Sequence, residues 1–196
     1  MTEPLRLYLA GPAGSGKTEV ARLLEERHGF GRVSLGDLCR EEAARRGVPA
    51  DRATLQAMGD LLRATDPARL AVLAWARAKT IRGPLVIEGV RLAAEGRYLR
   101  GRSVIGVAVD APEALRAARL WRRDRVAAVP EHRTEREALG LPVDLRLVND
   151  GDRKALEHQV RLVVARAALL QAERGSLLHH ARPVRTPRRE AAGMER

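Results

Sequence analysis

The residues with the clearest chemical meaning lie near the N-terminus, in the segment Gly11-Pro12-Ala13-Gly14-Ser15-Gly16-Lys17-Thr18. This segment fits the pattern G-x-x-x-x-G-K-[ST], whose glycines let backbone N–H groups surround a phosphate without Cβ clashes. The lysine can reach the β- and γ-phosphates of a nucleotide, and the hydroxyl is a hard oxygen ligand suited to Mg²⁺. We therefore expect Lys17 to bind phosphate, Thr18 to bind the metal, and the loop to form a cradle from Gly11, Ala13, Gly14, Ser15 and Gly16.

Two further segments carry charged residues in informative positions. Asp37 and Arg40 follow the first predicted helix, and Glu88 and Arg91 end an apolar run. The Arg guanidinium matches phosphate oxygens bidentately, so Arg40 and Arg91 are candidates for binding a second phosphate group. Glu88 stands at the end of a strand, where a carboxylate could hold Mg²⁺ through water. Asp37 has two readings: an acid in the first turn of a helix, or a group that orients Arg40 or a substrate.

The pattern of apolar residues predicts an α/β fold that brings these segments together. Short apolar runs alternate with amphipathic stretches, which is typical of a parallel sheet with helices on both faces. The predicted strands cover about residues 5–10, 32–34, 84–88, 103–109 and 145–148. The predicted helices cover about residues 16–27, 37–46, 51–64, 67–81, 112–123 and 152–173.

Taken in order, these segments resemble the nucleoside monophosphate kinase group of P-loop kinases, adenylate kinase among them. The resemblance covers roughly residues 3–170 and rests on the phosphate-binding loop, the G-D-x-x-R segment ending in Arg40, the strand end Val86–Arg91, and the segment Asp110-Ala111-Pro112. Leu55-Gln56-Ala57-Met58-Gly59 and Val148-Asn149-Asp150-Gly151 are similar to segments of proteins that look like dephospho-CoA kinase and phage deoxynucleotide kinases.

The resemblance implies a three-layer P-loop kinase fold with a five-stranded parallel sheet and an ATP- and Mg²⁺-dependent transfer of phosphate. In such a protein, residues 35–82 would be a helical acceptor-binding insertion and residues 124–141 a short lid. Arg119 and Arg123 would bind the ATP phosphates. The segment that contains Asn149 would either run past the adenine of ATP or form a simple turn. The implied catalytic residues are Lys17, Arg91, Arg119, Arg123 and Asp37, and the implied acceptor ligands are Asp37, Arg40 and Arg91.

Two departures from the family pattern leave the acceptor open. Glu88 stands where the family has Asp, and Arg91 follows the glycine one residue sooner than in adenylate kinase. The favoured acceptor is a nucleoside or deoxynucleoside monophosphate. Dephospho-CoA is an alternative, with Asp37 as the base. A third alternative is a P-loop ATPase linked to nucleic acid, although we see no nucleic-acid-binding module and do not expect such a partner.

Composition narrows the class of protein further. Of the 36 basic residues only three are Lys, and the formal net charge is +11. The apolar runs are too short to cross a bilayer, no secretory signal is recognised, and the one cysteine excludes an internal disulfide. We therefore expect a cytoplasmic monomer or homodimer, with one domain over residues 1–174 and a basic, mobile tail over residues 175–196. We expect Trp75 and Trp121 to pack in the protein and not to stack on bases.

Overall fold

The computed structural model describes residues 3–124 and 140–180, with side chains through residue 122 in the first segment and residue 174 in the second. Among these residues, five strands form one sheet in the order β2-β3-β1-β4-β5, and every neighbouring pair is parallel. The strands are β1 Arg6–Ala10, β2 Gly31–Ser34, β3 Leu85–Val90, β4 Ile105–Asp110 and β5 Leu145–Val148. The expected five-stranded parallel sheet is confirmed.

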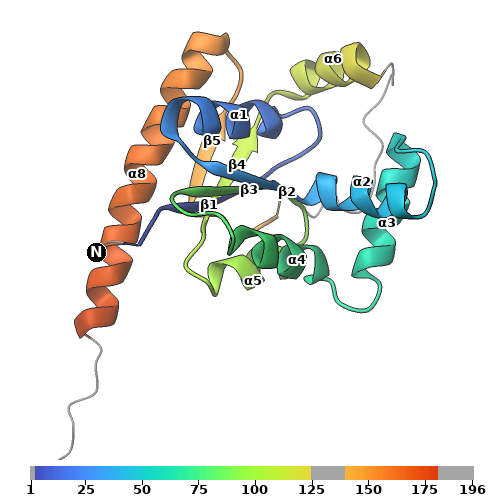
Figure 1. Ribbon diagram of the computed structural model, residues 1–196. Coiled ribbons are helices and arrows are strands. Elements are labelled where there is room, and N and C mark those ends of the chain that lie inside the picture. The colour runs from blue at the N-terminus through green and yellow to red at the C-terminus, as the bar shows by residue number, and fades with distance from the viewer. Residues whose placement is uncertain (1–2, 125–139, 181–196) are drawn as a thin grey trace, which may run out of the picture.

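Helices lie on both sides of this sheet. They are α1 Lys17–His28, α2 Leu35–Arg45, α3 Arg52–Arg63, α4 Arg69–Ala78, α5 Ala93–Arg100, α6 Glu113–Asp124 and α8 Arg153–His180. In Figure 1, α1 and α8 cover one face, while α4 and α5 cover the other. The helices α2, α3 and α6 gather near one end of the sheet, at the right of the picture.

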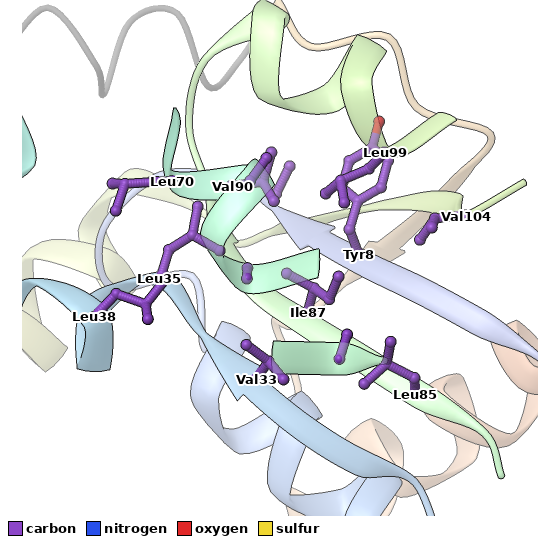
Figure 2. Packing of buried hydrophobic residues seen from close by; sticks show 14 of the residues in the cluster. Tyr8, Val33, Leu35, Leu38, Leu70, Leu85, Ile87, Val90, Leu99 and Val104 are labelled. Atoms are coloured by element: carbon purple, nitrogen blue, oxygen red, sulfur yellow. The ribbon is translucent and has the colours of Figure 1, made fainter. Parts of the chain in front are cut away.

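Side chains that alternate along the strands build a separate core on each face of the sheet. On β1, Leu7 and Leu9 pack with α1 and α8, whereas Tyr8 and Ala10 pack with the helices on the opposite face. Figure 2 shows the second cluster, in which Ile87 and Leu99 are fully buried. The last four residues of β1 are buried, and the phosphate-binding loop starts at the C-terminal end of this strand.

Tyr8 links three elements on that face. Its ring lies against Gly106 of β4, where an added Cβ would come within 2.5 Å of the ring, and its hydroxyl donates a hydrogen bond to the carbonyl oxygen of Pro142 at 2.6 Å. Burial raises the pKa of Tyr8 to about 12, and the nearby cation Arg100 opposes part of that rise. The neutral phenol thus joins β1 and β4 to the segment that leads into β5.

The order of the strands decides where a ligand can bind. The connection from β1 runs to β2 on one side of the sheet, whereas the connection from the neighbouring strand β3 runs to β4 on the other side, so the connections diverge between β1 and β3. In open parallel sheets, ligands bind at the carboxyl ends of the strands where the connections diverge. The loop after β1 and the end of β3 meet at this edge, as the sequence predicts.

The structure differs from the expected elements in three places. The short helix α5 was not expected, because Gly96 in its middle weakens the helical pattern. The helix α8 continues to His180, past the expected end near residue 173. Trp121 was expected to pack, but it is 48% exposed on α6. Trp75, which belongs to α4, does pack against the core.

Two expected regions fall largely outside the described residues. Most of the predicted lid, residues 125–139, and the end of the predicted tail, residues 181–196, are among them. In the part of the chain that is described, no helix has the length and apolar character needed to span a membrane.

Candidate active site

The phosphate-binding loop has the backbone that its glycines predict. The helix α1 begins at Lys17, and Gly16 before it has φ 97°, in the left-handed region that favours glycine. An added Cβ on Gly16 would lie 2.1 Å from Nδ2 of Asn149, and one on Gly11 would lie 2.1 Å from the carbonyl oxygen of Val109. The loop is therefore pressed against the ends of β4 and β5, and both glycines are required by space as well as by conformation.

Lys17 is folded over this loop. Its Nζ donates hydrogen bonds to the carbonyl oxygens of Gly11 and Pro12, each at 2.8 Å. These contacts hold the ammonium above the cradle at the N-terminus of α1, where the helix dipole favours an anion. Ala13 and Thr18 line the adjoining cleft, and Ser15 is fully buried inside the loop.

Arg119 of α6 reaches the same loop from the other side. Its Nη1 donates to the carbonyl oxygen of Gly14 at 3.3 Å, and its Nη2 donates to that of Asn149 at 3.1 Å. Asn149 is buried, and its Nδ2 donates to the carbonyl oxygen of Ser15 at 2.9 Å. The structure therefore places Asn149 as a brace between the loop and Arg119, while its contact with an adenine stays a prediction.

Glu88 lies at the carboxyl end of β3 and forms an ion pair that the sequence did not predict. It is 4% exposed, and its Oε1 accepts a hydrogen bond from Arg32 Nε at 2.9 Å and a second, shorter one from Nη2. Burial lowers the pKa of Arg32, but the hydrogen bond and charge of Glu88 outweigh it and raise that pKa overall. Arg32 was missed because its partner lies 56 residues away in the chain.

A bulge in β3 sets the direction of the chain after Glu88. Leu9 of β1 pairs with Glu88, but the next residue of β1 pairs with Val90, so the register skips Gly89. Gly89 is the extra residue of this bulge, and its φ is 88°. Gly89 therefore lies between Glu88, the last residue of β3 before the bulge, and Arg91, which lines the same cleft.

The donor set in this place fits Mg²⁺. Thr18 and Glu88 supply a hydroxyl and a carboxylate, the hard oxygen ligands that this ion takes in proteins. Both hydrogen bonds from Arg32 end on Oε1 of Glu88, which leaves Oε2 as the oxygen that could face a metal or its water.

One cleft of about 600 Å³ joins these groups to the acceptor-side residues. Among the described residues, seven basic and two acidic side chains line it, which suits a polyanionic ligand. They are Lys17, Arg32, Arg40, Arg52, Arg63, Arg91 and Arg119, with Asp60 and Glu88.

The structure brings the two predicted acceptor arginines into that cleft. Arg40 projects from α2 and Arg91 follows β3, and both line it. Asp37 is not among the lining residues; it is about half exposed, pairs with Arg40 at 2.5 Å, and its backbone N–H donates to the Ser34 side chain that caps α2. These contacts combine the two interpretations of Asp37: it lies in the first turn of α2, and it also pairs with Arg40.

Sequence reasoning missed Arg63 and Glu95, which form a buried ion pair beside Arg91. The sequence offered no local signal for this pair, because Arg63 lies beyond the quoted segment Leu55–Gly59 and its partner is 32 residues away. The side chain of Arg123 lies outside the described part, so its role at the ATP phosphates stays a prediction.

Comparison with known proteins agrees with this geometry. Residues 7–140 match the model of a family described as "AAA domain". The chain is 37% identical over 127 residues to a UPF0200 protein of Pyrococcus horikoshii, a match that covers 61% of this chain and 68% of that protein. This chain belongs to the UPF0200 family.

Two further similarities show the fold of this UPF0200 chain. A stretch of 40 residues is 52% identical to adenylate kinase of Salinibacter ruber, covering 20% of this chain and 19% of that enzyme. The crystal structure of shikimate kinase from Aquifex aeolicus superimposes with a TM-score of 0.53 at 16% identity, over 84% of this chain and 99% of that one. The fold is that of the P-loop kinase superfamily.

Proposed function

We propose that this UPF0200 protein transfers the γ-phosphoryl group of ATP to a nucleoside or deoxynucleoside monophosphate. The observation that carries the proposal is one continuous cleft among the described residues, which is lined by the phosphate-binding loop and by arginines of α2, α3 and the β3 end. Phosphoryl transfer between two polyanions requires cations on both the donor and the acceptor.

On the donor side, the loop N–H groups and Lys17 bind the β- and γ-phosphates of ATP. Arg119 is already held against the loop by the carbonyl oxygens of Gly14 and Asn149 and neutralises charge on the transferred group. Mg²⁺, held by Thr18 and through water by Glu88, would supply further charge neutralisation when bound. Arg32 keeps the Glu88 carboxylate in place.

On the acceptor side, Arg40 and Arg91 bind the phosphate of the monophosphate. An oxygen of that phosphate is anionic and attacks the γ-phosphorus without losing a proton, so the reaction needs alignment and no general base. The two carboxylates that the sequence analysis proposed fit this: Glu88 is paired with Arg32, and Asp37 is paired with Arg40 outside the cleft lining. A hydroxyl acceptor such as dephospho-CoA calls for a base, and these pairings favour it less.

The experiment incubates the protein with Mg-ATP and single acceptors and measures both ADP and the phosphorylated product. The acceptors are the ribo- and deoxyribonucleoside monophosphates and dephospho-CoA. We expect nucleoside diphosphates to form, and to be absent with Lys17→Ala. Phosphorylated dephospho-CoA would support the alternative acceptor, and ADP without any phosphorylated acceptor would support an ATPase.

A binding measurement distinguishes the proposed kinase from an ATPase linked to nucleic acid. Binding of a basic protein to a nucleic acid falls steeply with salt because counterions are released. We expect nucleotide binding in the cleft to change only modestly between 50 and 200 mM salt, the range over which charge-driven binding falls most clearly. A nucleic acid that binds with a steep salt slope and stimulates ATP hydrolysis would contradict the kinase assignment.

A further inference from the structure

The acceptor side of the cleft contains an ion pair that the proposed mechanism does not yet use. Nε of Arg63 donates to Oε1 of Glu95 at 2.8 Å, with the side chains 9% and 0% exposed. Replacing a buried ion pair by apolar residues is often neutral or stabilising. Stability alone therefore does not explain an arginine in α3 that lines the cleft.

The same carboxylate also fixes the predicted acceptor residue Arg91. Oε2 of Glu95 accepts hydrogen bonds from the backbone N–H of Arg91 at 2.9 Å and of Leu92 at 3.0 Å. These bonds cap the first turn of α5. The fully buried carboxylate of Glu95 therefore holds the guanidinium of Arg63 through one oxygen and the backbone of Arg91 through the other.

The helix α3 makes room for the guanidinium of Arg63. Gly59 lies in the interior of α3, where glycine is less favourable than alanine. A Cβ on Gly59 would lie 2.7 Å from Nη1 of Arg63 and 3.7 Å from Sγ of Cys39. The glycine therefore keeps the space that the guanidinium occupies.

The charges of three arginines act on Cys39. Burial raises the pKa of the Cys39 thiol, while the charges of Arg63, Arg91 and Arg40 lower it and that of Glu95 raises it. Cys39 itself lines the cleft between α2 and α3. The three guanidinium charges thus act on the same lining position although they come from three separate segments.

We propose that Arg63 is a third arginine of the acceptor site, and that Arg40, Arg63 and Arg91 together bind a dianionic phosphate monoester. The inference rests on the proposed function and adds a third phosphate-binding residue to its acceptor site. Glu95 holds Nε of Arg63, so the Nη groups are the donors that reach the phosphate oxygens. Glu95 is a positioning residue, because it acts through Arg63 and the Arg91 backbone.

The test measures binding by calorimetry, without turnover, for Arg63→Gln, Glu95→Gln and the wild type. The ligands are nucleoside monophosphates, the matching phosphate-free nucleosides, and ATP. We expect Arg63→Gln to weaken monophosphate binding roughly 10- to 100-fold, as for loss of a charge-assisted contact, with ATP binding unchanged. Nucleoside binding should be the same in both proteins, because the lost contact is to the phosphate.

Three further variants separate binding from folding. Arg97→Gln removes one charge from the exposed face of α5 and should bind every ligand as the wild type does. Arg63→Lys keeps the charge without the planar fork and should restore only part of the affinity. If Glu95→Gln fails to fold, Gly59→Ala still displaces the guanidinium without removing any charge, and should weaken monophosphate binding alone.

The outcomes distinguish this inference from the proposed function. If the wild type and Arg63→Gln bind monophosphates equally, Arg63 is structural and the inference is wrong, while the kinase assignment stands. Equal weakening of nucleosides and monophosphates by Arg63→Gln also overturns it. If the wild type binds neither monophosphates nor nucleosides but does bind ATP, the proposed acceptor fails, and this inference fails with it.

Discussion

At the scale of single residues, Lys17 is the cation that the site can least do without. Its ammonium is held above the loop by the carbonyl oxygens of Gly11 and Pro12, and it is not part of either apolar core. We expect Lys17→Ala to lower kcat at least about 100-fold, since a charge next to the transferred group is lost. Lys79→Ala, at the exposed end of α4, is the matched control for the removal of a lysine. Steady-state rates and thermal melting check both, and normal turnover by Lys17→Ala would sink the assignment of the loop.

Arg40 and Arg91 should differ from Arg119 in which substrate they affect. Replacing Arg40 or Arg91 with Ala should lower kcat/KM for the acceptor roughly 10- to 100-fold and leave ATP binding nearly unchanged. Arg119→Ala should weaken ATP binding with every acceptor, because Arg119 rests on the phosphate-binding loop. Kinetics with each substrate varied in turn decide this; an equal effect of Arg40→Ala on both substrates would mean that the two sides are not separate.

The sequence could predict residues that belong to a local pattern or to a segment with a family resemblance. The loop residues needed only a local pattern of glycines, a lysine and a threonine. Arg32 and Arg63 pair with carboxylates that lie 56 and 32 residues away. In a chain with 36 basic residues, nothing local separates these two arginines from those exposed to solvent. The roles predicted for Arg40, Arg91 and Arg119 stay predictions, although the structure brings all three to one cleft.

At the scale of elements, the contact of β1 with β4 through Tyr8 has a measurable dependence on pH. The folded state raises the pKa of Tyr8 from the ordinary value of 10.0 to about 12. Its contribution is therefore fully present below pH 10 and is lost as the pH rises towards 12, because the unfolded chain ionises first. We expect the wild type to lose about 2–3 kcal/mol of unfolding free energy over that interval from this residue.

The variant Tyr8→Phe isolates that effect. It should be less stable at pH 7 by about 1 kcal/mol, since the hydrogen bond to the Pro142 carbonyl is lost. Between pH 10 and 12 it should lose less stability than the wild type, because phenylalanine does not ionise. Denaturant titrations at several pH values check both statements; parallel pH curves for the two proteins would mean that Tyr8 ionises as readily in the folded chain.

Elements were predictable where their apolar pattern was strong. The five strands and six of the helices lie close to the expected ranges, because buried parallel strands give unbroken apolar runs. The helix α5 was missed: it has eight residues with a glycine in the middle, and Gly96 is there to accommodate the Tyr8 hydroxyl, 3.2 Å from where its Cβ would be. Since α5 carries Glu95, missing this helix also meant missing the residue that positions Arg63.

At the scale of the whole molecule, α8 closes one face of the sheet and its described contacts end at Arg174. Ala167 is fully buried, Gln171 donates to the carbonyl oxygen of Glu3 at 2.6 Å, and Arg174 pairs with Asp144 at 2.5 Å. We expect a chain of residues 1–174 to fold and to retain activity, because we expect residues 175–196 to be a tail that catalysis does not need.

A second truncation provides the comparison. A chain of residues 1–166 loses Ala167 and the two polar contacts, and should be less stable by about 2–4 kcal/mol, the usual cost of removing buried apolar groups and hydrogen bonds. Thermal melting and activity of both chains check this. Loss of activity in the 1–174 chain at unchanged stability would place part of the tail in the site.

The partial burial of α3 bears on how this protein could change during evolution. Gly59 is its one buried residue and Leu55, Met58 and Leu62 pack partly buried against the core, while the helix also carries Arg63 and much of the cleft wall. Substitutions at its exposed positions, such as Ala53, Ala57 and Leu61, therefore leave both cores intact and cost little stability, in contrast to substitutions in β1. A lineage could alter its preferred acceptor by changing α3 step by step while every intermediate still folds. Relatives that share the ATP side should accordingly diverge most in this helix.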